Sequence, residues 1–481
     1  MSTLLSRLVS ESAIYGLGAA ASQAVGIILI PLYARQLGTT DYGVLAIFNT
    51  TISLSAVLVG LALAQAFLRT YLKDTATLAE RRHVLGAAMT LRLAVSVASA
   101  AAIALLSEPL AQLLFGSSSW RDHMLLVSLI VLLDTVTVLP LSYLRAERRP
   151  TVYALLSVTR AVVGSILIVT FVVVAQMGVY GALLGSALAA AVTAAMGFAA
   201  LIIGGNFTLS SDWSLMRAML VFSLPLVPAA AASWVLSFID RYFLQAFEGS
   251  SAVGVYAAGY TVGLILNVFV VQPFTLMWSA AKWDIYRDND DAPRIFARVT
   301  TGFVVVASLA ALTIAAFATD AIRFLLTPAF EESRYVVPFS AFAAVLYGVY
   351  TLVGTGLNVA AKTKWIAASF GVAAVVNIGL NLVLIPAFGF MGAAYATILS
   401  YGLLTGLTGL LSHRFYPIPW QLRQMTIAMV VAFALAVGAL LGPDIVVWRI
   451  ACIVAFIPLM LGLRVVSAED VTTMRRALVS R

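Results

Sequence analysis

Fourteen long apolar segments fill the chain from about residue 12 to residue 464, and the loops between them are too short to fold as domains. Hydrophobic residues make up 62% of the 481 residues and charged residues only 10%. Soluble domains usually carry about 45 to 50% apolar and about 25% charged residues. The apolar surface of this chain therefore needs lipid around it, and the sequence predicts an integral membrane protein.

The length of the segments predicts that they are helices. A helix needs roughly 20 residues to cross a hydrocarbon core of about 30 Å, and in lipid only helices or closed barrels satisfy their backbone groups. These segments are too long for barrel strands, so we expect an all-α fold with 14 transmembrane helices. The expected spans are 12–36, 42–68, 84–106, 122–144, 151–175, 179–204, 216–246, 252–280, 299–318, 335–360, 365–387, 390–412, 425–442 and 445–463.

Basic residues predict the orientation of the chain, because Lys and Arg accumulate in short cytoplasmic loops. With the N-terminus inside, 21 of the 29 basic residues fall on the cytoplasmic side and five on the opposite side or its margin. The remaining three, Arg92, Arg160 and Arg241, lie inside expected helices. Both termini are therefore expected in the cytoplasm, and the net charge of +8 is a topology signal that requires no nucleic-acid partner.

Short sequences recur along the chain at a spacing of 211 residues. Gly43 in the run DYGVLA matches Gly254 in AVGVYA, and Gly178 in GVYGA matches Gly389 in GFMGA. Internal repeats of this kind are typical of transporters built from related halves. Six helices per half would keep the same orientation, which predicts two bundles related by a pseudo-two-fold axis along the membrane normal, with a cavity between them.

This repeat divides the chain into three expected parts. An N-terminal six-helix bundle is expected over 1–210 and a second over 211–414. Two further helices and a cytoplasmic tail occupy 415–481, where packing or lipid contact is the simplest role.

Two charged residues are expected near the middle of the membrane. Asp134 and Arg160 are each 13 residues from the basic turn centred near residue 147, so at about 1.5 Å per residue both lie roughly 20 Å from it. An unpaired charge at that depth is costly by at least a few kcal/mol. Either the two side chains form a structural ion pair, or they line a transport cavity.

Other polar residues and several prolines occur within the expected helices. Arg92 lies some three turns into the third helix, and Asp240 with Arg241 lies near the outer end of the seventh. Asn and Gln side chains more often join helices than contact a substrate. The amides with a candidate cavity role are Asn267, Gln272, Asn358, Asn377 and Asn381. The residues expected to bend helices and to take part in gating are Pro31, Pro225, Pro228 and Pro273.

The sequence offers little for catalysis or metal binding. The single cysteine, Cys452, cannot form an intrachain disulfide, and the three histidines are scattered without the clustering of a metal site. No GxxxxGK[ST] loop is present, so ATP hydrolysis is not expected. A membrane glycosyltransferase or polymerase would need a sizeable loop or an acidic cluster, and the adjacent pair Glu331 and Glu332 is better explained as a solvated loop. We therefore expect neither catalytic residues, nor a metal, nor a bound cofactor.

The chain resembles the polysaccharide biosynthesis and export family of lipid-linked oligosaccharide flippases, within the multidrug, oligosaccharidyl-lipid and polysaccharide exporter superfamily. The similarity extends over about residues 10–412. It is carried by PLYARQLG at 31–38 with DYG at 41–43, DRY at 240–242 with GVY at 254–256, the stretch 278–287, GLN at 356–358, KTK at 362–364, Asn377, Asn381, Pro386 and GAA at 392–394.

The resemblance implies transport of an isoprenoid-diphosphate-linked oligosaccharide of the undecaprenyl type, from the cytoplasmic to the outer leaflet, by alternating access. A diphosphate needs cations, sugars need hydroxyl partners, and the lipid tail can remain in the bilayer. The charged candidates for the substrate cavity are Arg160, Asp134, Arg92, Arg241, Asp240 and Arg35. Exchange of H⁺ or Na⁺, or the membrane potential, is the expected energy source, with Asp134 as a candidate ion or proton site.

The resemblance also implies a bacterial inner membrane and other polysaccharide assembly proteins as partners, with lipopolysaccharide or exopolysaccharide as the product. Fourteen helices are typical of the peptidoglycan-precursor flippases, whose first helix commonly carries cations. Here none lies between Ser12 and Arg35, which favours a surface polysaccharide instead. Extrusion of drugs or ions stays open as the second kind of transport.

Overall fold

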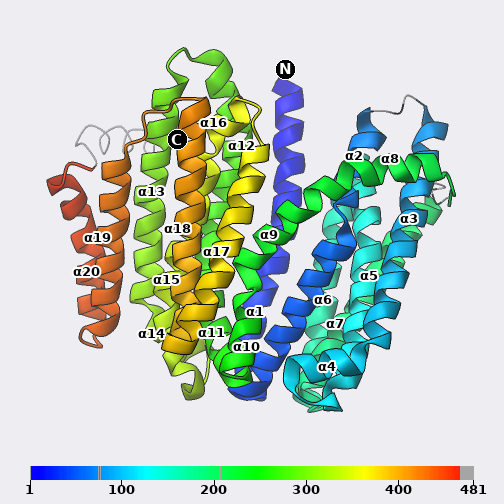
Figure 1. The fold of residues 1–481 in the computed structure, drawn as a ribbon, viewed down its shortest axis with the longest axis horizontal. Coiled ribbons are helices and arrows are strands. Elements are labelled where there is room, and N and C mark those ends of the chain that lie inside the picture. The colour runs from blue at the N-terminus through cyan, green and yellow to red at the C-terminus, as the bar shows by residue number, and fades with distance from the viewer. Residues whose placement is uncertain (1, 74, 76, 205–206, 208, 466–481) are drawn as a thin grey trace. The chain divides into compact units, whose positions relative to one another are not determined.

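The computed structural model describes residues 2–73, 75, 77–204, 207 and 209–465, and along residues 2–28 and 30 it describes the backbone alone. Helices make up nearly all of this part of the chain, and no β-strand occurs in it (Figure 1). The all-helical fold expected from the sequence is confirmed.

Twelve helical spans in the described residues are long and apolar enough to cross a membrane, and Val446–Gly462 is a shorter apolar helix. These spans match the expected segments from the second onward. The first expected segment, 12–36, falls on the N-terminal part of the first helix and lies mostly outside the residues whose side chains are described. The chain is thus a multi-pass membrane protein.

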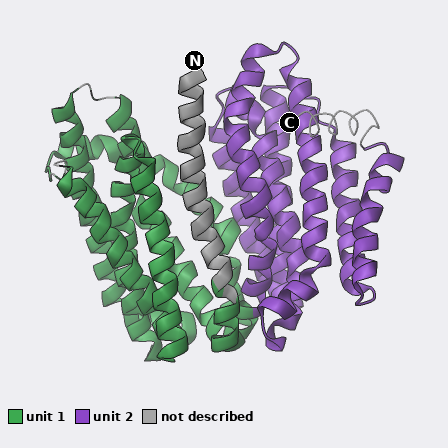
Figure 2. Cartoon of the chain, turned by 180° about the vertical axis from the view of Figure 1, so that it is seen from behind, with its two compact units in different colours: residues 1–254 green, residues 255–481 purple. Residues whose placement is uncertain are grey.

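The chain divides into two compact units, Met1–Gly254 and Val255–Arg481 (Figure 2). This boundary lies beyond the end of the expected first bundle at residue 210. The reason is that α8 (Trp213–Ser223), α9 (Val227–Phe238) and α10 (Asp240–Phe247) contact α1, α2 and α3 of the first unit. The division of the sequence repeat itself stays a prediction.

The first unit is built around α5 (Arg121–Ala146), which contacts both α3 and α7. Two apolar clusters fill it, one around Phe48 and Met124 and the other around Phe67 and Met89. Its remaining elements are α1 (Ser2–Gly60), α2 (Leu63–Lys73), α3 (Leu78–Leu105), α4 (Ser107–Phe115), the 3₁₀ turn η1 (Ser118–Trp120), α6 (Pro150–Val169), the π-helical turn η2 (Thr170–Val174), α7 (Gly178–Ile203) and the 3₁₀ turn η3 (Leu224–Leu226). The helix α11 (Ser250–Gly263) spans the unit boundary.

The helix expected over 42–68 is interrupted. Leu61 and Ala62 have positive φ angles of 45° and 50°, and they separate α1 from α2. Earlier in α1, Gly38 takes a non-helical conformation with φ 66°, which separates the first two expected segments. A glycine suits that conformation because it lacks a Cβ atom.

The glycines of the sequence repeat meet in the first unit. A Cβ atom added to Gly43 would overlap the backbone carbonyl of Ser250, and one added to Gly254 would overlap that of Thr39. Ser250 and Thr39 are themselves 211 residues apart, so the contact is symmetric under the repeat. These two glycines are therefore needed for the close crossing of α1 and α11.

The second unit has its main apolar core around α13 (Ala292–Ala316) and α15 (Val336–Val353), with Phe296, Phe342 and Leu352 fully buried. Its other elements are the π-helical turn η4 (Asn267–Val271), α12 (Gln272–Asp288), α14 (Ala318–Leu325), the 3₁₀ turn η5 (Pro328–Tyr335), α16 (Thr355–Val359), α17 (Lys364–Phe388), α18 (Phe390–Phe415), α19 (Leu422–Leu441) and α20 (Val446–Gly462).

The last two helices pack on this core. Ala428, Ala432 and Ala436 recur every four residues on one face of α19 and are completely buried in the core cluster, and α19 packs along α13. Small residues on one face let two membrane helices approach closely. Helix packing, one of the simple roles expected for these helices, is thus observed for α19.

Three of the four expected bends coincide with irregular backbone. Pro225 lies in η3 and Pro228 in the first turn of α9, while Pro273 is the second residue of α12, which directly follows the π-helical turn η4. Pro31 instead lies within α1, and the nearby break is at Gly38. The gating role of these prolines stays a prediction.

Candidate functional site

The face of α6 that carries Arg160 points into the first unit. The residues four positions before and after it, Leu156 and Gly164, are buried. Side chains four residues apart share a helix face. The exposed apolar side chains Val158 and Val162 lie on the other side of the helix. The part of Arg160 that remains accessible is therefore directed away from the apolar surface of α6.

Asp134 and Arg160 form the ion pair that their depth suggested. Both guanidinium Nη atoms of Arg160 contact the carboxylate of Asp134, at 2.6 Å to Oδ1 and 3.0 Å to Oδ2. Each side chain retains 32% of its surface accessible. Paired hydrogen bonds of this kind are the strongest geometry available to arginine and a carboxylate. The pair joins α5 to α6 and leaves part of each side chain uncovered by other protein atoms.

Arg92 of α3 is buried and binds backbone carbonyls. Its Nε donates to the carbonyl of Thr135 at 2.6 Å, and its Nη1 donates to those of Val59 and Gly60 at 3.2 and 3.0 Å. Val59 and Gly60 end α1, where the last carbonyls of a helix lack partners and carry partial negative charge. Arg92 therefore caps the break between α1 and α2.

The chain around Thr135 connects the two arginines. The hydroxyl of Thr135 donates to Ser96 Oγ of α3 at 2.9 Å, and the Thr135 carbonyl accepts from Arg92. The preceding residue, Asp134, binds Arg160. Pro140, five residues further on, lacks the N–H that a regular helix would use, and α5 continues through it to Ala146. We refer to Arg92, Asp134, Thr135 and Arg160 as the polar layer.

The polar layer carries a net positive charge, because it holds two guanidinium groups and one carboxylate. The arginine fork that holds Asp134 fits the oxygens of a phosphate equally well. An anion that reached the accessible part of Arg160 would compete with Asp134 for the same donors. Phosphate and diphosphate groups are thus anions whose charge and oxygen spacing suit the donors of Arg160.

Replacing Arg92 by leucine is expected to destabilise the first unit. Three carbonyls would lose a charged donor, and one hydrogen bond to a charged group is worth about 1.5–3 kcal/mol. We expect a loss at the upper end of that range, about 3 kcal/mol, and a smaller loss for Arg92→Lys, which keeps the charge but not the fork. Thermal unfolding of the purified protein measures both. Equal stability of Arg92→Leu and wild type would contradict the capping role.

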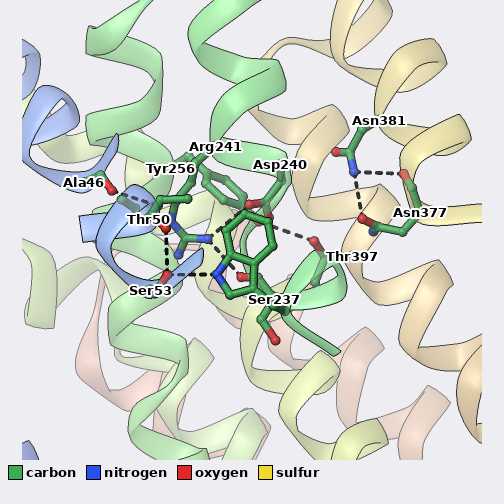
Figure 3. Close-up of polar contacts among 12 residues, drawn as sticks. Ala46, Thr50, Ser53, Ser237, Asp240, Arg241, Tyr256, Asn377, Asn381 and Thr397 are labelled. Atoms are coloured by element: carbon green, nitrogen blue, oxygen red, sulfur yellow. Dashed lines mark hydrogen bonds and ion pairs between the residues drawn. The ribbon is translucent and has the colours of Figure 1, made fainter. Parts of the chain in front are cut away.

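Asp240 and Arg241 form a second charged pair in the first unit (Figure 3). Arg241 Nη1 lies 3.1 Å from Asp240 Oδ1 and donates to the carbonyl of Ser237 at 3.0 Å. Its guanidinium also lies over the ring of Phe238, 5.0 Å from the centroid. Both charged side chains are buried, and burying two charges is favourable only with close partners of this kind.

Hydrogen bonds connect this region to α1. The hydroxyls of Thr51 and Tyr242 lie 2.9 Å apart, and Trp234 Nε1 donates to Ser53 Oγ at 2.9 Å. Such bonds hold membrane helices together where lipid offers no partner. They fix α9 and α10 against α1.

In the second unit, Asn377 and Asn381 are both buried on one face of α17 (Figure 3). Asn381 Nδ2 donates to Asn377 Oδ1 at 3.1 Å, and Asn377 Nδ2 donates to Ser400 Oγ at 3.0 Å. Asn381 Oδ1 has no hydrogen-bond partner among the described residues. The two asparagines thus join α17 to α18 and leave one acceptor oxygen unused.

The other candidate residues lie in separate places. Arg35 is exposed on α1, Asn267 lies in η4, and Gln272 is exposed at the start of α12. Asn358 donates to the carbonyl of Gly354 within its own turn. The structure brings Asp134, Arg160 and Arg92 together in the polar layer. The other four candidates contribute no side chain to that layer; they are Arg35, Asn267, Gln272 and Asn358. Their roles in substrate binding stay predictions.

Sequence reasoning missed an ion-pair network of the second unit, between α14, η5 and the loop before α20. Arg323 contacts Asp444 at 2.7 Å and Glu331 at 2.9 Å. Buried Arg449 pairs with Asp444 and with Asp320. The hydrogen bond from Arg323 lowers the pKa of Asp444. This network attaches the loop before α20 to α14 and η5, and its members are too far apart in sequence to be grouped by any motif.

The described residues contain no group of three or more side chains arranged to hold a metal ion. The polar layer consists of two guanidinium groups, one carboxylate and one hydroxyl. Together with the fold, it defines a multi-pass helical membrane protein with an accessible arginine–carboxylate pair inside its first unit.

Comparison with known proteins identifies the family. The model of the polysaccharide biosynthesis protein family matches residues 8–278, which is more than half of the chain. The chain belongs to this family. It is 23% identical over 440 residues to the probable low-salt glycan biosynthesis flippase Agl15 of Haloferax volcanii. The alignment covers 91% of this chain and 90% of the relative.

Solved structures share the fold. The lipid II flippase MurJ in an inward closed conformation superposes with a TM-score of 0.74 at 15% identity, covering 98% of this chain and all of that one. An inward-facing multidrug resistance MATE family transporter of the MOP superfamily gives 0.66 at 13% identity, covering 85% and 95%. At these identities the likeness concerns the fold alone.

Proposed function

We propose that the chain is a flippase that moves isoprenoid-diphosphate-linked oligosaccharides from the cytoplasmic to the outer leaflet by alternating access. The observation that carries the proposal is the accessible ion pair of Asp134 and Arg160 inside the first unit. A charged pair at this depth is costly unless it has a task or a tight structural role. Because about a third of each side chain is accessible, a role in transport explains the pair better than a structural role alone.

The proposed step is an exchange of partners at Arg160. The diphosphate of the substrate takes the two Nη donors that Asp134 holds in the free protein. Asp134 is then left without its cation, and a proton or Na⁺ compensates its charge. This step balances the charge of the site, but because the cation and the substrate bind together it does not by itself supply the driving force. Exchange of H⁺ or Na⁺, with Asp134 as the candidate ion site, is one proposed energy source. A membrane potential acting on the charged substrate is the other proposed source.

The remaining parts of the substrate need less from the protein. Sugar hydroxyls can bind neutral amides such as Asn377 and Asn381, and the isoprenoid tail can stay in the bilayer. The product of the proposed transport supplies a surface polysaccharide, lipopolysaccharide or exopolysaccharide, with assembly proteins of that pathway as partners. The proposed location is a bacterial inner membrane with both termini in the cytoplasm, where the basic loops belong. The curated relative is archaeal, so the bacterial assignment rests on the sequence resemblance.

The test is a substrate comparison in proteoliposomes. The purified protein is given a polyprenyl-diphosphate oligosaccharide, lipid II, and a small organic cation in parallel, and the outward movement of each is followed. The proposal expects movement of the oligosaccharide lipid that exceeds the other two. Movement of lipid II alone would make the chain a peptidoglycan precursor flippase, and efflux of the organic cation alone would make it a multidrug-type antiporter; either result overturns the proposal.

A further inference from the structure

A cavity of about 250 Å³ lies at the basic end of the first unit, away from the polar layer. It is formed where α2, the start of α3 and the turn after α5 meet. Its charged lining consists of Arg81, Arg82, Arg149 and Glu147. Three cations against one carboxylate leave an excess of positive charge.

Glu147, the one carboxylate among the described residues that line the cavity, is already shared. Glu147 Oε1 accepts a hydrogen bond from the hydroxyl of Tyr71 at 2.8 Å, whereas the nearest nitrogen of Arg81, Nη1, is 3.8 Å away. That separation exceeds a hydrogen bond. Arg81 Nε is buried and has no hydrogen-bond partner among the described residues. Arg81 therefore keeps donors that Glu147 does not satisfy.

The backbone holds these groups in place. Thr77 and Glu80 form a reciprocal capping box at the start of α3, which fixes the turn that carries Arg81. The backbone N–H of Arg149 donates to the carbonyl of Leu144 at 2.9 Å and closes the turn that precedes Arg149. Both turns that carry the arginines are thus held by hydrogen bonds, so the arginines line a cavity with fixed walls.

The chemistry of the cavity suits the phosphate of a lipid headgroup. Basic loops lie on the cytoplasmic side, at the level of the headgroups. Drug-sized pockets measure about 300–1,000 Å³. A cavity below that range fits a phosphate or diphosphate but is small for an oligosaccharide. Loop arginines that served only to set the topology would need neither a cavity nor a buried Nε donor.

We infer that this cavity binds the phosphate group of a lipid in the cytoplasmic leaflet, with Arg81 and Arg149 as its main donors. The inference does not depend on what the protein transports, because the ligand can be a membrane phospholipid or the diphosphate of a lipid-linked sugar. Both present the same oxyanion to the same guanidinium groups.

The test counts lipids retained by the purified full-length protein in native mass spectrometry. Phosphatidic acid and diacylglycerol are compared, since they differ only in the phosphate. We expect retention of phosphatidic acid alone, and at least about tenfold weaker binding in Arg81→Gln/Arg149→Gln. The matched control, Arg148→Gln/Arg217→Gln, removes the same charge from residues that do not line the cavity and is expected to bind within about twofold of wild type.

Glu147→Gln is expected to change the binding of phosphatidic acid in the direction opposite to Arg81→Gln/Arg149→Gln. It keeps a side-chain acceptor for Tyr71 but removes the negative charge, so phosphatidic acid should bind more tightly than in wild type. Equal retention by wild type and Arg81→Gln/Arg149→Gln would overturn the inference, as would an equal loss in the control. Binding of inorganic pyrophosphate with no retention of phosphatidic acid or of a polyprenyl diphosphate would also contradict it, because the ligand would then be a soluble anion, whereas retention of the polyprenyl diphosphate alone would identify the lipid-linked sugar as the source. Thermal unfolding confirms that each variant is folded.

Discussion

Asp134→Asn is expected to abolish transport and to destabilise the first unit. The substitution leaves the guanidinium of Arg160 without its carboxylate inside the membrane. Breaking a fully buried pair costs about 3–5 kcal/mol, and because a third of each side chain is accessible we expect about 2 kcal/mol here. Thermal unfolding gives the stability, and movement of the oligosaccharide lipid in proteoliposomes gives the activity.

The double substitution Asp134→Asn/Arg160→Gln separates the two effects. It removes both charges, so stability should recover above that of the single variant, whereas transport should stay lost because the cation for the diphosphate is missing. The exposed pair Asp284–Arg287 provides the control, and Asp284→Asn should change stability by less than about 0.5 kcal/mol. Full transport by the double variant would show that the pair is only structural.

Gly43→Ala is expected to prevent folding or to lower stability by about 3 kcal/mol or more. The new Cβ would overlap the backbone carbonyl of Ser250, and a backbone carbonyl cannot swing aside as a flexible side chain can. Overpacking a tight contact typically costs about 1–3 kcal/mol and occasionally more. Gly254→Ala should behave alike, since it meets the carbonyl of Thr39 in the same way. The yield of monodisperse protein and its unfolding temperature measure the effect.

Gly371→Ala is the matched control for this prediction. Gly371 lies in α17, and a Cβ there would meet no atom within 4 Å. The same substitution should therefore be neutral or stabilise by up to about 1 kcal/mol, because alanine favours a helix more than glycine does. If Gly43→Ala unfolded at the same temperature as Gly371→Ala, the close crossing of α1 and α11 would be refuted.

The sequence predicts that Asp134 and Arg160 lie at the same depth, because depth follows from the distance along each helix from the basic turn between them. An ion pair was one of the two arrangements expected from that depth, and the structure shows it. The spans are predictable for the same reason, since the length and hydropathy of each segment are local properties. The repeat spacing similarly singled out Gly43 and Gly254, although their direct contact follows only from the three-dimensional fold.

Arg92 shows what the sequence could not provide. Its partners are backbone carbonyls at a helix break, and the break occurs at Leu61 and Ala62, residues with no breaking tendency of their own. The network of Arg323, Asp444 and Arg449 was equally hidden, because it joins segments more than a hundred residues apart. Contacts of this kind depend on packing, which no local pattern records.

The most direct test of the account is the transbilayer movement of isoprenoid-diphosphate oligosaccharides by wild type, Arg160→Ala and Asp134→Asn in proteoliposomes, with folding monitored for each. The account predicts movement by wild type and its loss in both variants while they remain folded. The contradicting result is a folded, correctly oriented wild type that moves none of several oligosaccharide donors.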